Sequence, residues 1–440
     1  MNKMNESLNI TKGSINFFFL NIQTIIVCLL PVALIIGPAI ADILATLSSI
    51  IFLLLVIRNK EWEYLYNPVS LLLFGWSLYL IISSLLSSDI FFSLESSLFY
   101  WRMPLFALSI WYLLDKRSNV KKLFLYSITI TFSVILIDAY YQFFNGVNFL
   151  GYPYYESKGR LSGLFGDELR LGSYLSRLMP ILFALAVVSI KKPRNFLFLL
   201  CFFLILIDVL VYLTGERSAF IILLITTFLM IILITDFKRI RIFTFTISII
   251  LILIVTFFND KVRFRMIENT YNQLNFTNEN YVADHELFVV TSLSMFGDNP
   301  ITGIGPKMYR NLCNNEEYFT KSELYTGCST HPHFTYLQVL AETGIIGFLF
   351  LLSAFIFVLY ILTKHFFKKY LRKEKNLTDQ QVCLYISLFI TLFPFIPTNS
   401  FFNNWICIIY FLPLGFLLNT YSQNLKTYFK SRKVKNAKNS

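Results

Sequence analysis

Apolar runs of about 20 residues recur along the whole chain, and they restrict its fold more than any other feature. A helix of that length crosses a hydrocarbon core of about 30 Å. Of the 440 residues, 56% are hydrophobic and 15% are charged, whereas soluble domains carry about 25% charged residues. The sequence therefore predicts an all-α polytopic membrane protein. The net charge of +12 comes from short basic clusters between apolar runs, a pattern that orients helices and does not indicate nucleic-acid binding.

The apolar runs, bounded by charged residues, Pro or Gly, predict about twelve transmembrane helices. The first run is too long for the core of a signal peptide, so we expect it to remain as a helix. The expected spans are residues 15–36, 38–57, 68–86, 97–114, 121–143, 171–190, 195–213, 216–235, 240–258, 338–363, 382–398 and 404–420.

Basic residues gather in alternate loops of this arrangement, and the positive-inside rule assigns those loops and both termini to the cytoplasm. The clusters begin near Arg58, Lys116, Lys191, Lys238, Lys364 and Lys426. The opposite face then carries a loop at 144–170 and a large loop at 259–333. The predicted divisions are 1–258 with nine helices, the loop 259–333, 334–420 with three helices, and a basic tail at 421–440. Because long loops without a role are uncommon, we expect the large loop to be functional and partly helical.

Two of the six cysteines, Cys313 and Cys328, share the large loop. An oxidising periplasm permits a bridge between them, and we expect a disulfide. The other four lie within predicted spans, where a free cysteine usually behaves as a small hydrophobic residue: Cys28, Cys201, Cys383 and Cys407.

Three arginines lie toward the exported ends of predicted spans: Arg102, Arg177 and Arg217. A charge at the centre of a span costs at least about 2.5–3.5 kcal/mol, so such residues are functional candidates. The alternative for Arg102 and Arg177 is a long side chain that reaches the membrane interface. Arg217 fits that alternative less well, because it lies in the tight connection TGERSAF.

The loop before the sixth span reads ESKGRLSGLFGDELRLGSYLSRLMP and combines glycines with alternating charge. The planar guanidinium group suits bidentate recognition of phosphate. We therefore expect arginines in this segment to converge with Arg217 on an anionic group: Arg160, Arg170 and Arg177. The alternative is a solvated interfacial loop in which Asp167 and Glu168 neutralise two of these arginines.

The most informative string is CSTHPHFTYLQVLAETGIIGFLF, where the large loop ends and a predicted span begins. His331 and His333 lie beside the start of that helix. Backbone donors at a helix N-terminus attract anions, and imidazole transfers protons near neutral pH. A base and a phosphate site would thus share one place. The alternatives are a histidine that caps the helix, or a metal pair, for which no further ligands stand at suitable spacing.

Upstream, the string DHELFVVTSLSMFGDNPITGIGPKMYR contains GIG. No βαβ unit flanks it, so it is not a dinucleotide fingerprint, and we expect it to turn the chain between two short surface helices. His285 and Arg310 are candidates for polar contacts with substrate there, with a structural role as the alternative.

The string HPHFTYLQVLAETGIIG resembles the histidine motif of the O-antigen ligase and O-antigen polymerase superfamily, and GERSA resembles its arginine segment. The resemblance covers about residues 160–347 and places the functional histidine on His333 and the functional arginine on Arg217. Two positions depart from the pattern. Phe334 replaces the usual Asn, and His285 stands where an arginine is often found, unless Arg263, Arg265 or Arg310 takes that part.

The resemblance implies a GT-C-like membrane glycosyltransferase in the bacterial inner membrane, surrounded by membrane lipids. An O-antigen ligase would move a glycan from an undecaprenyl-diphosphate-linked donor to lipid A-core, by inversion and without metal or cofactor. An O-antigen polymerase or a protein O-oligosaccharyltransferase with the same donor would share these motifs. A transporter of lipid-linked sugars is the alternative from another class; it usually shows repeated halves and midplane binding residues, and neither is evident here.

Overall fold

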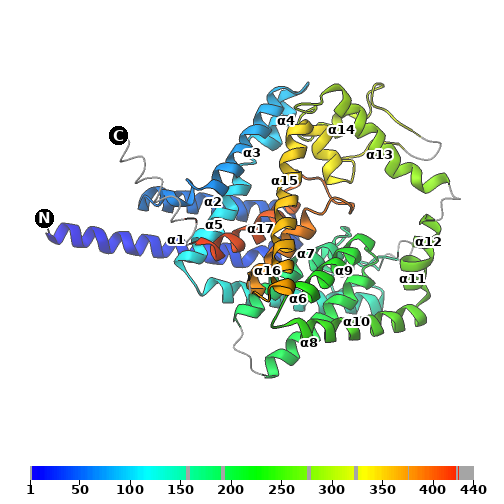
Figure 1. The fold of residues 1–440 in the computed structure, drawn as a ribbon, viewed down its shortest axis with the longest axis horizontal. Helices are drawn as coiled ribbons and strands as arrows, with labels where there is room; N and C mark the ends of the chain where they lie inside the picture. The colour runs from blue at the N-terminus through cyan, green and yellow to red at the C-terminus, as the bar shows by residue number, and fades with distance from the viewer. Residues whose placement is uncertain are drawn as a thin grey trace.

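The computed structural model describes residues 2–154, 159–189, 194–274, 279–321, 326–374, 376–422 and 425, and the regular secondary structure within these ranges is helical (Figure 1). The side chains of 2–13, 194–196, 273–274 and 279–285 are outside the description, as are Lys191, Lys192 and most of the predicted basic tail. The longer helices are α1 (Asn2–Ile36), α2 (Pro38–Asn59), α3 (Pro68–Leu85), α5 (Arg102–Lys116), α6 (Val120–Asn145), α7 (Leu171–Ser189), α8 (Arg194–Leu213), α9 (Arg217–Leu233), α10 (Lys238–Phe258), α13 (Glu279–Asp298), α15 (Thr335–Leu371), α16 (Asp379–Thr391) and α17 (Asn404–Thr420).

Every predicted span overlaps one of these helices. Within the described residues, seven helices are long and apolar enough to cross a membrane, namely α1, α2, α3, α6, α7, α10 and α15. α9, α17 and the described part of α8 are apolar but shorter. The 15 residues of α5 and the 13 of α16 are shorter still. A polytopic helical membrane protein is confirmed, and the number of twelve spans stays a prediction.

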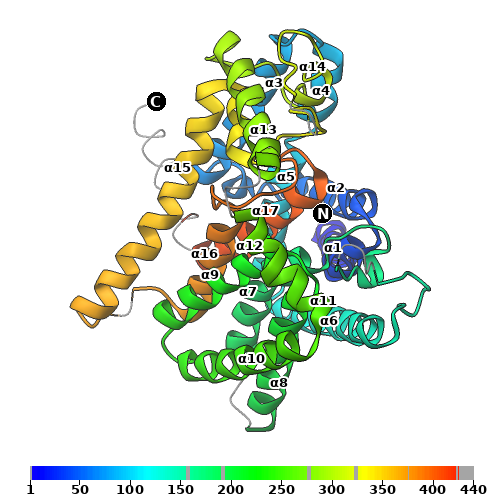
Figure 2. The same cartoon turned by 90° about the vertical axis from the view of Figure 1, so that its right-hand side faces the viewer.

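The helices differ in how far other helices surround them. α7 contacts α6, α8, α9, α16 and α17, and 83% of its apolar window is buried. α10 and α15 leave most of theirs exposed, and α15 runs along the edge of the molecule (Figure 2). In a membrane protein an apolar exposed face meets lipid, so α7 is an internal helix and α15 is a peripheral one.

The segment between α10 and α15 contains several helices, and the last two of them lie on α15. Beyond α10 the chain forms α11 (Asp260–Arg263), a π-turn at Phe264–Glu268, and α12 (Asn269–Leu274), and α14 (Tyr309–Leu312) follows α13. α13 and α14 contact α15 and lie near α4 (Ile90–Ser97) at one end of the molecule (Figure 1). Met295, Met308 and Tyr309 belong to a separate small hydrophobic cluster here. Cys313 and Cys328 form a disulfide with Cα atoms 5.0 Å apart.

The GIG string does more than turn the chain. α15 breaks at Gly344, where φ is 65°, and residues 300–305 pair with the opened backbone. Ile304 N donates to Ala341 O at 3.0 Å, and Gly305 N donates to Glu342 O at 2.9 Å. A Cβ at Gly303 would lie 2.4 Å from backbone atoms of Glu342 and Thr343. Glycine is therefore required for close backbone approach, which the sequence reading of a simple surface turn missed.

Arg241, which stands in the basic cluster that begins near Lys238, is a buried residue of α10. Arg241 is fully buried and donates to both carboxylate oxygens of Asp208 on α8, at 2.7 and 3.0 Å. It also donates to the Thr227 hydroxyl on α9. Because α10 begins at Lys238, Arg241 lies one turn inside the helix and not in the loop. Its side chain links α10 to α8 and α9.

Candidate functional site

Arg217 is the first residue of α9 and lies where three chain segments meet. Its Nη2 donates to the carbonyl of Arg265 at 3.2 Å, and Arg265 Nε donates to the carbonyl of Gly215 at 3.2 Å. Gly215 has φ 69°, and a Cβ there would lie 2.2 Å from the carbonyl oxygen of Gly159. The tight turn before α9 therefore depends on glycine and brings Arg217, Arg265 and the loop before α7 into one place.

Glu216 occupies the centre of this arrangement and is buried. Its carboxylate accepts from Gly172 N at 2.7 Å, and from Ser173 N and Oγ at 3.2 and 2.8 Å. A carboxylate at the N-terminus of α7 satisfies free backbone donors there. The Arg160 guanidinium lies 3.9 Å from the same carboxylate. Both oxygens of this carboxylate accept hydrogen bonds from the start of α7 and so hold α7 against α9.

Arg177 lies two turns into α7 and is 3% exposed. It lies within electrostatic reach of Glu216 and Tyr410, but it makes no hydrogen bond or ion pair within the described part of the chain, and its Nη1 is a buried donor without a partner there. The alternative of a side chain that reaches the membrane interface is therefore wrong for Arg177, because its side chain does not reach the surface. A buried guanidinium without a hydrogen-bonded counter-ion is costly, which makes Arg177 a strong candidate for binding an anion.

The remaining arginines of this loop differ in their surroundings. Arg160 Nη2 donates to the carbonyl of Leu169 at 2.8 Å, while its Nε is buried without a described partner. Arg170 pairs with exposed Glu168 at 2.6 Å and lies 5.9 Å from the Trp405 ring centroid. Arg160 thus joins the group around Glu216. For Arg170 the alternative holds, because Glu168 neutralises its charge. No described ion pair or hydrogen bond connects Arg170 to the residues around Glu216.

The two histidines of the HPH string have different environments. His331 is buried, and its Nε2 lies 3.3 Å from the carbonyl of Thr398, so Nε2 carries the proton and Nδ1 accepts from the Thr330 hydroxyl at 3.0 Å. Burial, with the neighbouring His333, lowers the pKa of His331 to about 4. His331 is therefore neutral near pH 7 and holds the segment between α16 and α17.

His333 adopts the left-handed conformation, with φ 60°. Its carbonyl accepts from Thr398 N at 2.8 Å, while its half-buried ring lies 4.3 Å from the His331 ring and edge-on to Phe288. Phe334 follows as the N-cap residue of α15 and makes no side-chain cap bond. The His333 side chain therefore does not cap α15. Its Nε2 lies 3.5 Å from Ser329 Oγ.

Two side chains that the sequence reading did not select hold this region together. Gln338 donates to Ser400 Oγ at 2.9 Å and to Glu342 Oε2 at 3.0 Å, and its oxygen accepts from Phe401 N at 2.8 Å. Glu342 Oε1 accepts from Tyr309 N at 3.1 Å. Both are polar residues four positions apart in an apolar helix, so they lie on the same helix face. The string YLQVLAE therefore indicated a buried polar face in the sequence.

The arginine group and the histidines approach each other through α17. Tyr410 on α17 lies within electrostatic reach of Arg177 and beside Thr335, the first residue of α15. The Thr335 hydroxyl contacts that of Thr398, whose backbone binds both histidines. Helix α17 contacts α7, and α16 contacts α7, α9 and α15. Residues more than 110 positions apart thus lie around one polar region.

The other two predicted substrate contacts lie on the segment before α15. The backbone of His285 belongs to α13, but its side chain lies outside the described residues. Arg310 on α14 is exposed, and its charge helps to lower the pKa of His331. Of the three arginines considered in place of His285, Arg265 is the one beside Arg217. Arg263 pairs instead with exposed Asp260 and Glu268.

The fold and the site together define a polytopic helical membrane protein with buried, incompletely paired arginines near a histidine motif. Residues 199–352 match the family model described as O-antigen ligase. This match confirms the resemblance to the O-antigen ligase and O-antigen polymerase superfamily. It includes Arg217, Arg265 and both histidines of the motif, whereas Arg160, Arg170 and Arg177 precede it. No curated protein matches the chain.

Proposed function

We propose that this protein is a GT-C-like glycosyltransferase of the bacterial inner membrane, acting as an O-antigen ligase. It transfers a glycan from an undecaprenyl-diphosphate-linked donor to lipid A-core. The observation that carries the proposal is the group of Arg160, Arg177, Arg217 and Arg265 around Glu216, a carboxylate already bonded to the start of α7. Arg177 is buried and the other three arginines are half-buried, and a cluster of guanidinium groups suits a diphosphate. The family match supports the general activity.

In the proposed reaction, the acceptor hydroxyl oxygen bonds to the anomeric carbon of the donor glycan while the bond from that carbon to the diphosphate oxygen breaks. The diphosphate leaves with the electron pair, and the arginines stabilise its charge electrostatically. His333 accepts the hydroxyl proton as general base. Attack from the face opposite the leaving group inverts the anomeric centre. His331, Gln338 and Glu342 position the segments around His333 and do not exchange protons with substrate.

The orientation follows from the charge pattern of the loops. The segment 259–333 and the start of α15 lie on the periplasmic face, where the glycan-bearing donor and the acceptor are both present. The surrounding lipid contacts the exposed apolar faces of α10 and α15. Acceptor and donor then meet beside α17, between the arginines and His333.

The direct test is glycan transfer by purified His333→Ala. We expect a loss of about 10²–10⁴-fold, the usual contribution of a general acid or base, with unfolding unchanged. Arg217→Lys keeps the charge but loses the planar fork, so we expect it to fail as well. Arg263→Lys is the matched control, because Arg263 pairs with the exposed carboxylates of Asp260 and Glu268. Normal transfer by well-folded His333→Ala contradicts the assignment.

A deletion strain separates the ligase from its alternatives. A ligase predicts polymeric glycan that is made but not attached to lipid A-core. Absence of polymer, with single repeat units still attached, would instead identify an O-antigen polymerase. Intact surface glycolipid with unglycosylated protein would identify a protein O-oligosaccharyltransferase. Accumulation of the lipid-linked donor on the cytoplasmic face would identify a transporter.

A further inference from the structure

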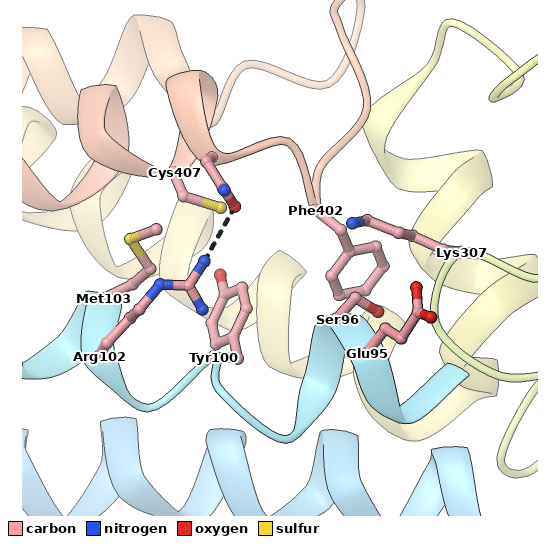
Figure 3. A pocket seen from close by; sticks show the side chains of 9 residues that line it. Glu95, Ser96, Tyr100, Arg102, Met103, Lys307, Phe402 and Cys407 are labelled. Atoms are coloured by element: carbon pink, nitrogen blue, oxygen red, sulfur yellow. Dashed lines mark hydrogen bonds between the residues drawn. The ribbon is translucent and has the colours of Figure 1, made fainter. Parts of the chain in front are cut away.

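A second cationic pocket lies away from the arginine group. It has a volume of about 80 Å³ and is formed by the end of α4, the start of α5, the loop before α14 and the start of α17. Figure 3 shows Arg102 and Met103 on one side, with Lys307 approaching beside Phe402 on the other. The pocket has room for a small polar group such as phosphate.

The loop that carries Lys307 is firmly held. Lys307 adopts the left-handed conformation, with φ 62°, and the preceding Gly305 has no room for a side chain because a Cβ would lie 2.4 Å from Ser87 Cβ. Ser93 Oγ donates to the carbonyl of Pro306 at 3.1 Å. A left-handed non-glycine residue persists only where its surroundings impose it, so the Lys307 side chain is directed into the pocket by packing.

The two cations of the pocket differ in how their charge is balanced. Arg102 binds both oxygens of Asp42, at 2.9 and 3.1 Å, and donates to Asn404 Oδ1 at 3.1 Å. Lys307 is half-buried and forms no ion pair or side-chain hydrogen bond within the described ranges, and the exposed Glu95 at the pocket rim is not bonded to it. Burial, together with the charges of Arg310 and Arg102, lowers the pKa of Lys307.

The pocket is connected to the histidine motif by a short stretch of chain. The segment from Thr398 to Asn404 binds His331 and His333 at its first residue and lines the pocket at Phe402 and Asn404. Gln338 fixes the middle of this segment through Ser400 and Phe401. A ligand in the pocket would therefore contact the same segment that binds both histidines of the motif.

We infer that the pocket of Arg102, Lys307 and Asn404 is a phosphate-binding subsite that anchors a phosphate group of the acceptor glycolipid. An ammonium group with three free donors and a guanidinium fixed by Asp42 and Asn404 suit an oxyanion. This inference rests on the proposed function for the choice of occupant. The donor diphosphate is assigned to the arginines around Glu216, so a second phosphate, in a pocket joined to the histidine motif by residues 398–404, comes from the other substrate.

Protection from amine acetylation tests the subsite without requiring activity. The full chain in detergent is treated briefly with acetic anhydride, and acetylation of Lys307 and exposed Lys321 is quantified by mass spectrometry. We expect inorganic phosphate to slow acetylation of Lys307 several-fold and to leave Lys321 unchanged, relative to sodium chloride at equal ionic strength. Equal effects on both lysines, or none on Lys307, would overturn the proposal.

The same measurement identifies the source of the phosphate. Protection by the intact acceptor, but not by enzymatically dephosphorylated acceptor, is the expected result. Equal protection by both forms would overturn the role of phosphate. Protection only by undecaprenyl diphosphate or by phosphatidylglycerol vesicles would keep the subsite and reassign its occupant to the donor or to a membrane lipid.

Kinetics then connect the pocket to transfer. Lys307→Gln should raise KM for the phosphorylated acceptor about 10- to 100-fold, the effect of one charge-assisted hydrogen bond, with kcat and donor KM unchanged. Lys307→Arg should restore most of the affinity, and Lys321→Gln is the matched control. An unchanged acceptor KM contradicts the anchoring role. If the wild type transfers no glycan, the proposed function fails, whereas phosphate protection of Lys307 still decides the subsite.

Discussion

Two buried arginines of this protein should respond in opposite ways to the same substitution. Arg177 is 3% exposed and makes no described hydrogen bond, whereas Arg241 is fully buried and bidentate to Asp208. Methionine keeps a flexible, unbranched apolar stem in place of either side chain and removes the charge. Arg177→Met removes an unsatisfied donor and should stabilise the fold by about 1–3 kcal/mol. Arg241→Met leaves a buried carboxylate unpaired and should destabilise it by about 3–5 kcal/mol.

The measurement is denaturant-induced unfolding of the purified variants in detergent, with glycan transfer assayed in parallel. Arg177→Met should be inactive although it is more stable, because a charge retained at a cost to the fold is expected to serve ligand binding. Replacing both Arg241 and Asp208 by apolar residues should recover most of the lost stability. The reasoning is refuted if Arg177→Met is destabilised as strongly as Arg241→Met, or if it transfers glycan normally.

Two further predictions concern the segments that hold the site. The pKa of His331 is lowered to about 4 in the fold, whereas the pKa of a free histidine is about 6.5. Between these two pH values the unfolded chain binds more protons than the folded chain, so the free energy of unfolding should fall by up to about 3 kcal/mol as the pH falls from about 6.5 to about 4. His331→Gln, which keeps a donor for Thr398, should reduce that pH dependence; unfolding measured from pH 7 to 4 checks this, and identical slopes would exclude it. Gly303→Ala should disrupt the pairing with the break in α15 and lower the midpoint of thermal unfolding, whereas Gly297→Ala, with open space around its Cβ, should not. Equal midpoints would contradict the required close approach.

Hydropathy was sufficient to locate the helices, because transfer of an apolar residue to lipid depends mainly on its own side chain and its neighbours along the chain. It did not separate internal from peripheral helices. α7 and α10 are both apolar spans by composition, yet 83% of the first window and 28% of the second are buried by other helices. That difference comes from packing between segments, which no local pattern specifies.

The charge pattern was a good guide to loops and a poor one to individual residues. Arg241 stands near Lys238 and Arg239 in the sequence, and only the position of Asp208 on another helix shows that it is a buried ion pair. Arg170 and Arg160 belong to one loop and look equivalent in sequence. Pairing with Glu168 removes the first from the arginine group, and contact with Glu216 places the second within it.

The sequence by itself determined the class of protein and the order of its helices, and it predicted the motif residues His333 and Arg217, because these depend on hydropathy, loop charge and short strings. Only the tertiary structure decided which side chains meet. Glycine-dependent close approaches at Gly215 and Gly303 set the contacts of distant segments, and they act between residues far apart in the chain. For the same physical reason, the Lys307 pocket has no signature in the sequence: its walls come from four separate segments that only packing brings together.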